Sequence, residues 1–433
     1  MKNACLREYA KYTISNVLGM IGLSCYILAD TFFVAKGLGS NGLAALNLAI
    51  PVYSFIHGTG LMLGMGGATR YSMMKSQNME EKGNEVFSHT MLLALCFAAF
   101  FMVMGLFMAK GIAGLLGADA EVFEMCRTYL KVLLLFSPMF LLNDILLCFV
   151  RNDGAPQLSM AAMLMGSFSN IILDYLFIFP LGMGIFGAVF ATGLAPVISL
   201  AFLSSFFIRK RNRFSLVKCR LSSLLFGHLL GCGVPSLVGE VSSGIVMIVF
   251  NTIVLGLQGN TGVAAYGVIA NLSLVIIAVY TGIAQGIQPV ISRYYGMGNG
   301  DNIQKILKYA VSTVVILSAV IYGCMFLGAG GIASVFNSEG NAKLQTIAVS
   351  GIQIYFTACI FAGLNIVMAM YFTSTDNARP ANVISVLRGF VLIIPSAFLL
   401  SGLWGMTGLW LAFPLPELFT AIISLQLYRN RRK

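Results

Sequence analysis

Long apolar runs fill most of this chain, and each is about as long as the roughly 20-residue helix that crosses a lipid bilayer. The runs are continuous, whereas the strands of a membrane β-barrel alternate between apolar and polar residues over about 10 positions. We therefore expect an all-α integral membrane protein with twelve transmembrane helices. The runs lie at residues 12–35, 44–69, 88–109, 128–150, 158–180, 184–208, 224–257, 263–292, 306–328, 345–372, 380–401 and 405–428.

The composition agrees with a bilayer-spanning chain and excludes three large classes of protein. Hydrophobic residues make up 58% of the 433 positions, and charged residues make up only 10%, against roughly 25% in a soluble domain. A cytosolic enzyme, a nucleic-acid-binding protein or a disordered scaffold needs far more polar surface at this length. The polar N-terminus passes into the first apolar run without a convincing cleavage site, so we expect that run to be retained as a helix.

The net charge of +11 is explained by where the basic residues lie. If the N-terminus is cytoplasmic and the loops alternate, 21 Lys and Arg residues fall on the cytoplasmic side and 5 on the other, with Arg388 inside a span. An excess of this kind marks the cytoplasmic side of membrane proteins. We therefore expect both termini in the cytoplasm and no nucleic-acid partner.

The two halves of the chain resemble each other at an offset near 220 residues. Asp30-Thr31 matches Asn251-Thr252, and the glycine-rich segment 182–191 matches 402–412. An offset of six helices restores the original orientation in the membrane, so we expect two parallel six-helix repeats, with a transport path between them. The expected division is an N-lobe at 1–213, a cytoplasmic linker at 214–222 and a C-lobe at 223–433.

Acidic residues inside the spans are the main candidates for function, because a charged Asp at the centre of a span costs about 2.5–3.5 kcal/mol. Asp30 lies late in the first span, one turn after Tyr26. Asn170 and Asp174 are four residues apart in the fifth span and share a helix face, and Thr192 follows in the sixth. Their hard oxygen ligands suit a proton or Na⁺. A hydrogen-bonded polar contact between helices is the structural alternative.

A second set of polar residues lies in or beside spans of the C-lobe. Glu240, Asp376 and Glu417 are possible coupling or substrate-binding acids, and Arg388 could pair with one of them. In the N-lobe, Asp144 is a weaker candidate, and His57 is more typical of a packing residue than of a proton relay.

No other site chemistry is evident in the sequence. The nine cysteines are scattered through apolar runs, so we expect packing residues and no metal other than a possible Na⁺ at Asp30, Asn170, Asp174 and Thr192. No nucleotide-binding, zinc-protease or serine-hydrolase motif is present, so we expect no cofactor, no ATP-driven step and no enzymatic activity.

These residues resemble the multidrug and toxic compound extrusion (MATE) family of transporters, in its MepA-like branch. The resemblance runs along essentially the whole chain, and the segments that carry it are ADTFFVAKGLGSNGLAAL from Ala29, RNDGAP from Arg151, NIILDYLFIF from Asn170, GIFGAVFAT from Gly184, GVPS from Gly233, VAAYGV from Val263, GIAQGIQPVISRYYG from Gly282 and GLWLAFPLPE from Gly408.

The resemblance implies a secondary antiporter in the prokaryotic cytoplasmic membrane that exports organic cations and drugs in exchange for H⁺ or Na⁺. The family's coupling-ion residues match Asp30, Asn170, Asp174 and Thr192, with Tyr26 beside them. The first helix departs from the family pattern, because Ile14-Ser15-Asn16 stands where a proline is common.

Two other functions remain open. A lipid or lipid-linked oligosaccharide flippase of the same superfamily would need a basic central cavity, yet acids predominate inside the spans, where Arg388 is the only clearly placed basic residue. A membrane-embedded enzyme would need a clustered set of His and Asp residues, and the three histidines are dispersed. We expect a monomer whose partners are membrane lipids and a small-molecule substrate.

Overall fold

The computed structural model describes residues 2–337 and 340–432, and every regular element among them is helical. Lys433, the last residue of the basic C-terminal run, lies outside these ranges. The elements are α1 (Lys2–Ser76), α2 (Glu80–Val103), π-helix η1 (Met104–Met108), α3 (Ala109–Leu115), α4 (Phe123–Leu135), α5 (Ser137–Asn152), α6 (Pro156–Ile178), α7 (Gly184–Ile208), α8 (Ser223–Gly296), α9 (Gly300–Phe336), α10 (Ala342–Tyr355), 3₁₀-helix η2 (Phe356–Ala358), α11 (Cys359–Ser374), α12 (Ala378–Val386), π-helix η3 (Leu387–Val391), α13 (Ile393–Leu411) and α14 (Pro414–Arg432).

Two of these helices are far too long to be single spans. At 75 and 74 residues, α1 and α8 would each extend roughly 110 Å if straight, at about 1.5 Å per residue. Each instead contains one glycine with non-helical backbone angles, Gly39 in α1 and Gly259 in α8. Positive φ is cheap only for glycine, so the chain turns back at these two residues, and each long helix supplies two spans.

The expected all-α membrane fold is confirmed. In the described part of the chain, eight helices are long and apolar enough to cross a membrane, or nine when the pair α4 and α5, bent by 48°, counts as one span. Counting α1 and α8 twice and dividing the chain at the left-handed Gly405 gives the twelve expected segments. The last of them bends where α14 begins at Pro414.

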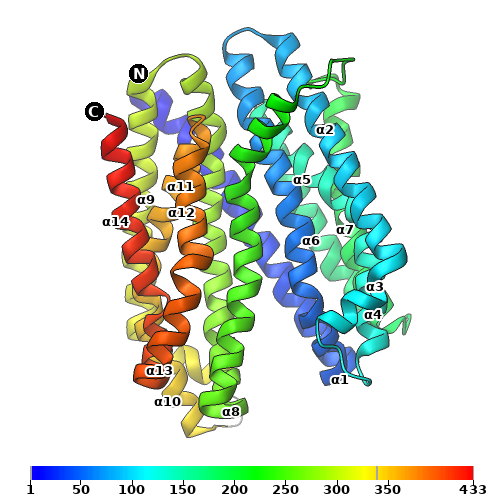
Figure 1. Ribbon diagram of the computed structural model, residues 1–433, viewed down its shortest axis with the longest axis vertical. Helices are drawn as coiled ribbons and strands as arrows, with labels where there is room; N and C mark the ends of the chain where they lie inside the picture. Colours follow the sequence, from blue (N-terminus) through cyan, green and yellow to red (C-terminus); the bar gives the residue numbers. More distant parts are fainter. Residues whose placement is uncertain (1, 338–339, 433) are drawn as a thin grey trace.

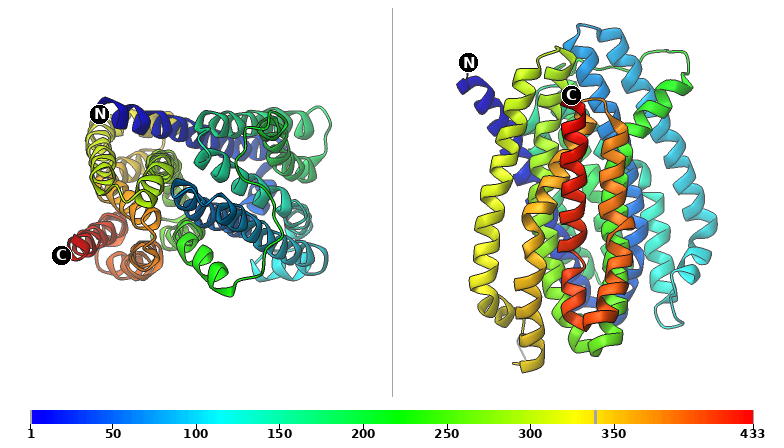
Figure 2. Two further views of the ribbon diagram at one scale, coloured as in Figure 1. Left: turned by 90° about the horizontal axis from the view of Figure 1, so that it is seen from above. Right: turned by 60° about the vertical axis from the view of Figure 1, so that its left-hand side comes forward.

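The segments form two bundles that stand side by side (Figure 1). Helices α1 to α7 make the first bundle and α8 to α14 the second, and α1 and α8 share the most extensive contact between helices. Both ends of the described chain lie at the same end of the molecule (Figures 1 and 2).

Backbone landmarks recur in the two bundles at the offset that the sequence suggested. Gly39 has φ 68° and ψ −159°, and Gly259, 220 positions later, has φ 62° and ψ −155°. Gly184 and Gly405 likewise both have positive φ, of 62° and 58°. By this register Asp30 corresponds to Phe250, so the sequence match of Asp30 with Asn251 is one residue out of register.

The segment between α7 and α8 is held against the first bundle. Phe214 is 1% exposed and packs among the rings of Tyr71, Phe87 and Phe149. The backbone N–H of Arg213 also donates to Asp153 Oδ2, at 2.7 Å. The predicted linker at 214–222 therefore begins with a buried anchor residue.

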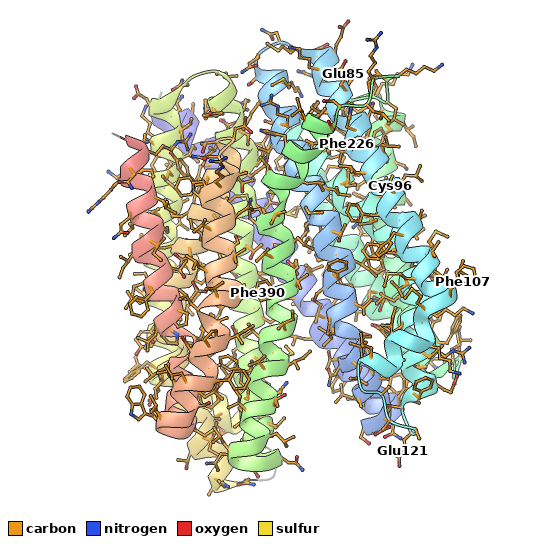
Figure 3. The ribbon with its side chains drawn as sticks, in the orientation of Figure 1. Glu85, Cys96, Phe107, Glu121, Phe226 and Phe390 are labelled. Atoms are coloured by element: carbon orange, nitrogen blue, oxygen red, sulfur yellow. The ribbon has the colours of Figure 1, made fainter. Side chains whose placement is uncertain are left out.

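Large apolar side chains cover the outside of both bundles, as expected of a surface that meets lipid tails. Phe107, which is 79% exposed, points away from the bundle in Figure 3. Acidic Glu85 and Glu121 lie at opposite ends of the molecule in the same view.

The two bundles are joined by hydrogen bonds mainly in the half of the molecule that holds the termini. Near the end with the termini, Glu8 accepts hydrogen bonds from Arg293 and Tyr294. Arg70 forms an ion pair with Asp376 there, at 2.9 Å. Deeper in, the amide groups of Asn152 and Gln288 bond to each other. In the described part of the chain, the side-chain hydrogen bonds between the bundles lie in this half. The structure is therefore closed at the end with the termini.

Candidate functional site

Asp30 and Asp174 meet in the interior of the first bundle. Asp30 is 7% exposed, Asp174 is fully buried, and their carboxyl groups lie close enough to interact. The Oδ1 atoms of both residues are buried and have no hydrogen-bond partner in the described structure. A hydrogen bond between two carboxyl groups requires a proton between them, because an ionised carboxylate only accepts. The arrangement is therefore chemically suited to holding a proton or a metal cation.

Asn170 and Thr192 complete the surroundings of this pair. When the Asn170 amide is oriented to satisfy its neighbours, its nitrogen donates to Asp174 Oδ2 at 3.0 Å and its oxygen accepts from the Thr192 backbone N–H at 3.3 Å. The Thr192 hydroxyl donates to the Ala188 carbonyl of its own helix. The structure therefore brings together four of the five residues expected at the N-lobe site.

The fifth residue, Tyr26, is turned toward a different partner. Its hydroxyl lies 2.6 Å from that of Tyr53, and the Tyr53 ring stacks on the ring of His57. Tyr129 of α4, which the sequence did not single out, is buried and lies near Thr192 and both aspartates. No pattern distinguishes it from other aromatic residues in apolar runs.

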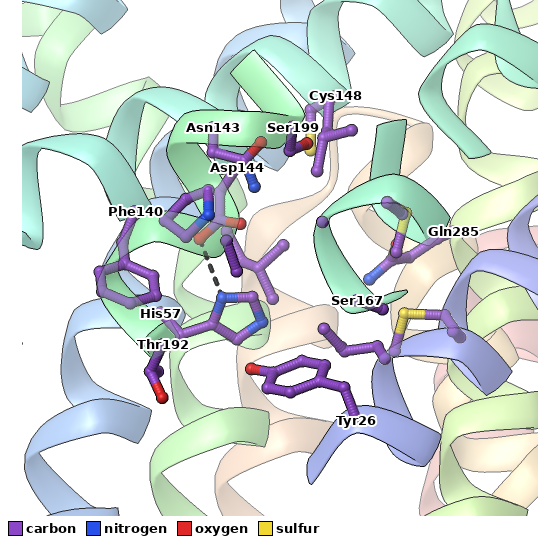
Figure 4. Close-up of a pocket in the computed structure, with 18 of the residues that line it drawn as sticks. Tyr26, His57, Phe140, Asn143, Asp144, Cys148, Ser167, Thr192, Ser199 and Gln285 are labelled. Carbon is purple, nitrogen blue, oxygen red and sulfur yellow. Dashed lines mark hydrogen bonds and ion pairs between the residues drawn. The ribbon is translucent and has the colours of Figure 1, made fainter. Parts of the chain in front are cut away.

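A cavity lies within the first bundle, and of the described residues that line it only Gln285 comes from the second bundle (Figure 4). Its walls carry aromatic and apolar side chains, among them Phe140. Tyr26 and Thr192 form the part of the wall that is nearest to the acid pair. The His57 Nδ1 atom lies 2.9 Å from Asp144 Oδ2, and the two residues point toward each other in Figure 4. His57 is thus nearly buried, its ring is satisfied by Asp144, and it also lines the cavity.

Glu240 approaches this ion pair from the second bundle. It belongs to the first span of α8 and lies within electrostatic range of both His57 and Asp144. The β-carbon of a side chain at Gly58 would lie 3.1 Å from Glu240 Cβ, so the two backbones run close together here. An acid from each lobe therefore faces one histidine.

Arg151 is a buried basic residue that the sequence placed in a loop. It is 2% exposed at the end of α5 and lines the same cavity. Its guanidinium donates to Asn16 and, at 3.0 Å, to Gln285 of the second bundle, while its Nε has no partner. The sequence placed only Arg388 clearly inside a span, and the structure adds Arg151 as a basic residue buried at the end of one.

Arg388 and Glu417 pair with each other in the second bundle. The Arg388 Nη2 atom lies 2.6 Å from Glu417 Oε1, and its Nε also donates to this carboxylate. Asn365 donates to Glu417 Oε2 at 2.7 Å, and Glu417 is 2% exposed. The structure thereby identifies the acid partner that the sequence left open for Arg388.

Asp376 lies at the end with the termini, in the turn between α11 and α12. Its carboxylate contacts His228 at 3.0 Å and Arg70 at 2.9 Å. Burial favours the neutral acid, but the hydrogen bond from His228 and the nearby charges outweigh it and hold the pKa of Asp376 below its usual range. Glu240, Glu417 and Asp376 therefore lie apart from one another and do not form a shared C-lobe site.

The second bundle has no copy of the paired acids at the equivalent position. Phe250, which corresponds to Asp30, stacks on Tyr266, and Tyr266 stacks on Trp410. An aromatic core thus replaces the polar site, so the two repeats share a backbone while only the first carries the acid pair.

Comparison with known proteins identifies one family. The family model described as MatE matches residues 16–176 and 235–399, one stretch in each half of the chain. The multidrug export protein MepA of Staphylococcus saprophyticus is 26% identical over 98% of this chain and 93% of its own length. The protein of that name from Staphylococcus aureus is 24% identical over the same shares.

Solved structures share the fold at 23% identity. A crystal structure of MATE in complex with MaL6 has a TM-score of 0.92 and covers 98% of this chain and 95% of its own. An outward-facing multidrug resistance transporter of the MATE family has a TM-score of 0.90 over the same shares. A MOP superfamily transporter from Pyrococcus furiosus, described as having a binding pocket of reverse polarity, reaches 0.89, also over these shares.

Proposed function

The chain belongs to the MatE family, and from this premise we propose that it is a secondary multidrug exporter that exchanges organic cations or drugs for H⁺ or Na⁺. Relatives named as multidrug export proteins, matched along nearly the whole chain, support this assignment. We take the protein to be a monomer in the cytoplasmic membrane, with both termini in the cytoplasm.

The buried contact between Asp30 and Asp174 is the observation that carries the proposal. Two carboxylates this close cannot both be ionised without a cation between them. Cation binding and release at this pair therefore changes the charge between α1 and α6. A carboxyl pair close enough to share a proton favours H⁺ as the coupling ion, and Na⁺ would occupy the same oxygens and the Asn170 amide.

The closed end of the molecule gives the proposal a direction. With the termini in the cytoplasm, the hydrogen bonds between the lobes seal the cytoplasmic side, and the cation enters from outside. One charge moving inward across 100 mV supplies about 2.3 kcal/mol, which is roughly a 50-fold concentration ratio at 1.4 kcal/mol per tenfold. Binding at the acid pair rearranges α1, α6 and α7, and the drug leaves outward.

The cavity beside the acid pair is the proposed drug site. Aromatic rings such as Phe140 and Tyr53 and the flexible thioethers of Met20 and Met163 suit apolar surfaces of varied shape. Asp144 on the same wall already pairs with His57, so a cationic drug would compete with His57 for this carboxylate. Because this cavity adjoins Thr192, cation binding and drug binding would affect each other.

Efflux from proteoliposomes under separately imposed pH and Na⁺ gradients tests the coupling. Wild-type protein should expel a cationic dye when the pH gradient is applied. Asp30→Asn and Asp174→Asn should each lose at least tenfold in rate at normal protein levels. Asp301→Asn removes an exposed acid from the first turn of α9 and serves as the control. Full dye efflux by both site variants would refute the role of the acid pair. Dye efflux under a Na⁺ gradient but not under a pH gradient would identify Na⁺, rather than H⁺, as the coupling ion.

A flippase for lipids or lipid-linked oligosaccharides remains the second candidate, and one observation favours it. Arg151 carries a buried positive charge on the cavity wall, which could meet an anionic headgroup. Its two terminal nitrogens, however, are already engaged by neighbouring side chains. Headgroup-dependent translocation in the same proteoliposomes, without dye efflux, would select the flippase.

A further inference from the structure

A histidine, a cysteine and an aspartate meet on the second bundle, away from both the acid pair and the cavity. His228 and Cys232 are four residues apart near the start of α8 and therefore share a helix face. Asp376 reaches them from the turn between α11 and α12. The expectation that the cysteines are packing residues alone does not account for this arrangement.

The ligand atoms of these three side chains converge on one point. Nε2 of His228 lies 3.0 Å from Asp376 Oδ1, and Cys232 Sγ lies 3.8 Å from the same oxygen. All three ligand atoms are within 4.8 Å of one another. A tetrahedral zinc ion, with bonds of about 2.0 Å to N and O and 2.3 Å to S, sets its ligand atoms roughly 3.3–3.6 Å apart. The two distances from Asp376 Oδ1, 3.0 and 3.8 Å, lie on either side of that range.

The backbone also holds Asp376 in place for such a role. Asp376 has φ 58°, a left-handed conformation that few residues other than glycine adopt. The amide N–H of the next residue, Asn377, is bonded to the Phe372 carbonyl, which keeps the turn closed. The aspartate is thus presented toward α8 by a turn of fixed shape.

The donor set selects a class of ion. One thiolate, one imidazole and one carboxylate suit zinc and similar borderline transition metals, whereas Mg²⁺ and Ca²⁺ prefer oxygen ligands alone. The second carboxylate oxygen of Asp376 is bonded to Arg70, which belongs to the other lobe. Arg70 therefore stands as an outer partner that orients the ligand.

We propose that His228, Cys232 and Asp376 form a binding site for a zinc-class divalent ion at the contact between the two lobes, with a fourth position left for water. Arg70 reaches Asp376 only while this end of the molecule is closed. Because Arg70 orients Asp376 for the ion in the closed state, the ion binds that state more tightly. Bound ion therefore stabilises the closed end and slows the conformational cycle. The binding step does not depend on the transport activity proposed above.

Titration of the purified, chelator-treated full-length protein with Zn²⁺ and Co²⁺ tests the site. Co²⁺ bound through a thiolate gives a sulfur-to-metal charge-transfer band that other ligand sets lack. Cys232→Ser should abolish this band and weaken Zn²⁺ binding at least tenfold. His228→Gln, at a half-exposed position, should weaken binding to a similar extent while keeping the metal-free melting temperature.

Cys219→Ser is the matched control, because Cys219 also contacts a histidine. Its Sγ lies 3.5 Å from His89 Nδ1, but no carboxylate completes that pair among the described residues. Cys219→Ser should bind both ions as the wild type does. Absence of micromolar Zn²⁺ binding by the wild type, or loss of the Co²⁺ band in Cys219→Ser rather than Cys232→Ser, would overturn the proposal.

Zinc inhibition provides a second readout. Added Zn²⁺ should slow dye efflux by the wild type severalfold and leave Cys232→Ser unaffected. If the protein binds Zn²⁺ specifically but transports nothing, the metal site is supported and only the proposed export function is contradicted.

Discussion

The acids that the sequence singled out differ in what surrounds each of them. Asp30 and Asp174 share one buried space with unpartnered oxygens, which suits reversible cation binding. Glu417 is instead saturated by Arg388 and Asn365, which suits a permanent structural contact. Buried acidic residues thus differ in their expected roles, cation binding or structural contact, because their neighbours differ.

The Arg388–Glu417 pair predicts a stability effect that is separable from coupling. Arg388→Met should lower the melting temperature, because it leaves Glu417 buried without its counter-charge, a loss of about 3–5 kcal/mol. The double variant Arg388→Met with Glu417→Gln should recover much of this loss. Thermal unfolding in detergent measures both.

Transport per folded molecule separates this pair from the acid pair. The double variant should retain efflux when the rate is corrected for the amount of folded protein, whereas Asp174→Asn should not. Loss of corrected efflux in the double variant would place Glu417 in the coupling machinery after all.

At the scale of helices, α1 and α8 cross where both lack side chains. A β-carbon at Gly233 would lie 2.0 Å from the Met62 carbonyl oxygen, and one at Gly66 would lie 2.1 Å from the Leu229 carbonyl oxygen. These distances are too short for any residue but glycine. Close approach through small residues is how helices associate where lipid supplies no hydrophobic drive.

Gly233→Ala should therefore force the two lobes apart at this crossing. We expect a loss of about 1–3 kcal/mol in stability, the usual cost of overpacking, and a lower melting temperature. Gly239→Ala, in the same helix with nothing within 4 Å of the added carbon, is the control and should be neutral. Equal melting temperatures for Gly233→Ala and Gly239→Ala would show that the two helices can move apart without loss of stability, which contradicts the prediction.

At the scale of the whole molecule, the hydrogen bonds between the lobes in the described part of the chain lie in the half with the termini. Glu8 near the start of α1 binds Arg293 and Tyr294 near the end of α8. Breaking such contacts should favour the state that opens at the end with the termini. Cys5, which is 4% exposed and lies three residues before Glu8 on the same helix, reports on that opening.

Glu8→Gln should therefore raise the rate at which a maleimide labels Cys5, by severalfold, as measured by mass spectrometry of the labelled peptide. The charge swap Glu8→Arg with Arg293→Glu should return the rate to the wild-type value. Labelling of Cys219, which is part-exposed in the segment between α7 and α8 outside the spans, should not change and is the internal control. Unchanged labelling of Cys5 in Glu8→Gln would contradict a role for this contact in closing the end.

The sequence by itself determined the spans, the repeat and the candidate residues of the N-lobe site. It could do so because a bilayer requires every backbone polar group to be satisfied within a helix, which leaves long apolar runs as the only solution. Acids inside such runs are costly, so Asp30 and Asp174 stand out among their apolar neighbours in the chain.

Only the tertiary structure decided which of these residues meet. In a membrane helix the lipid-facing and buried sides are both apolar, so hydrophobic periodicity does not tell which side points inward. The His57–Asp144 pair, the burial of Arg151 and the meeting of Cys232 with Asp376 all depend on how the helices are rotated and crossed. Those rotations come from close packing between helices that are far apart in the sequence, which no single run of sequence records.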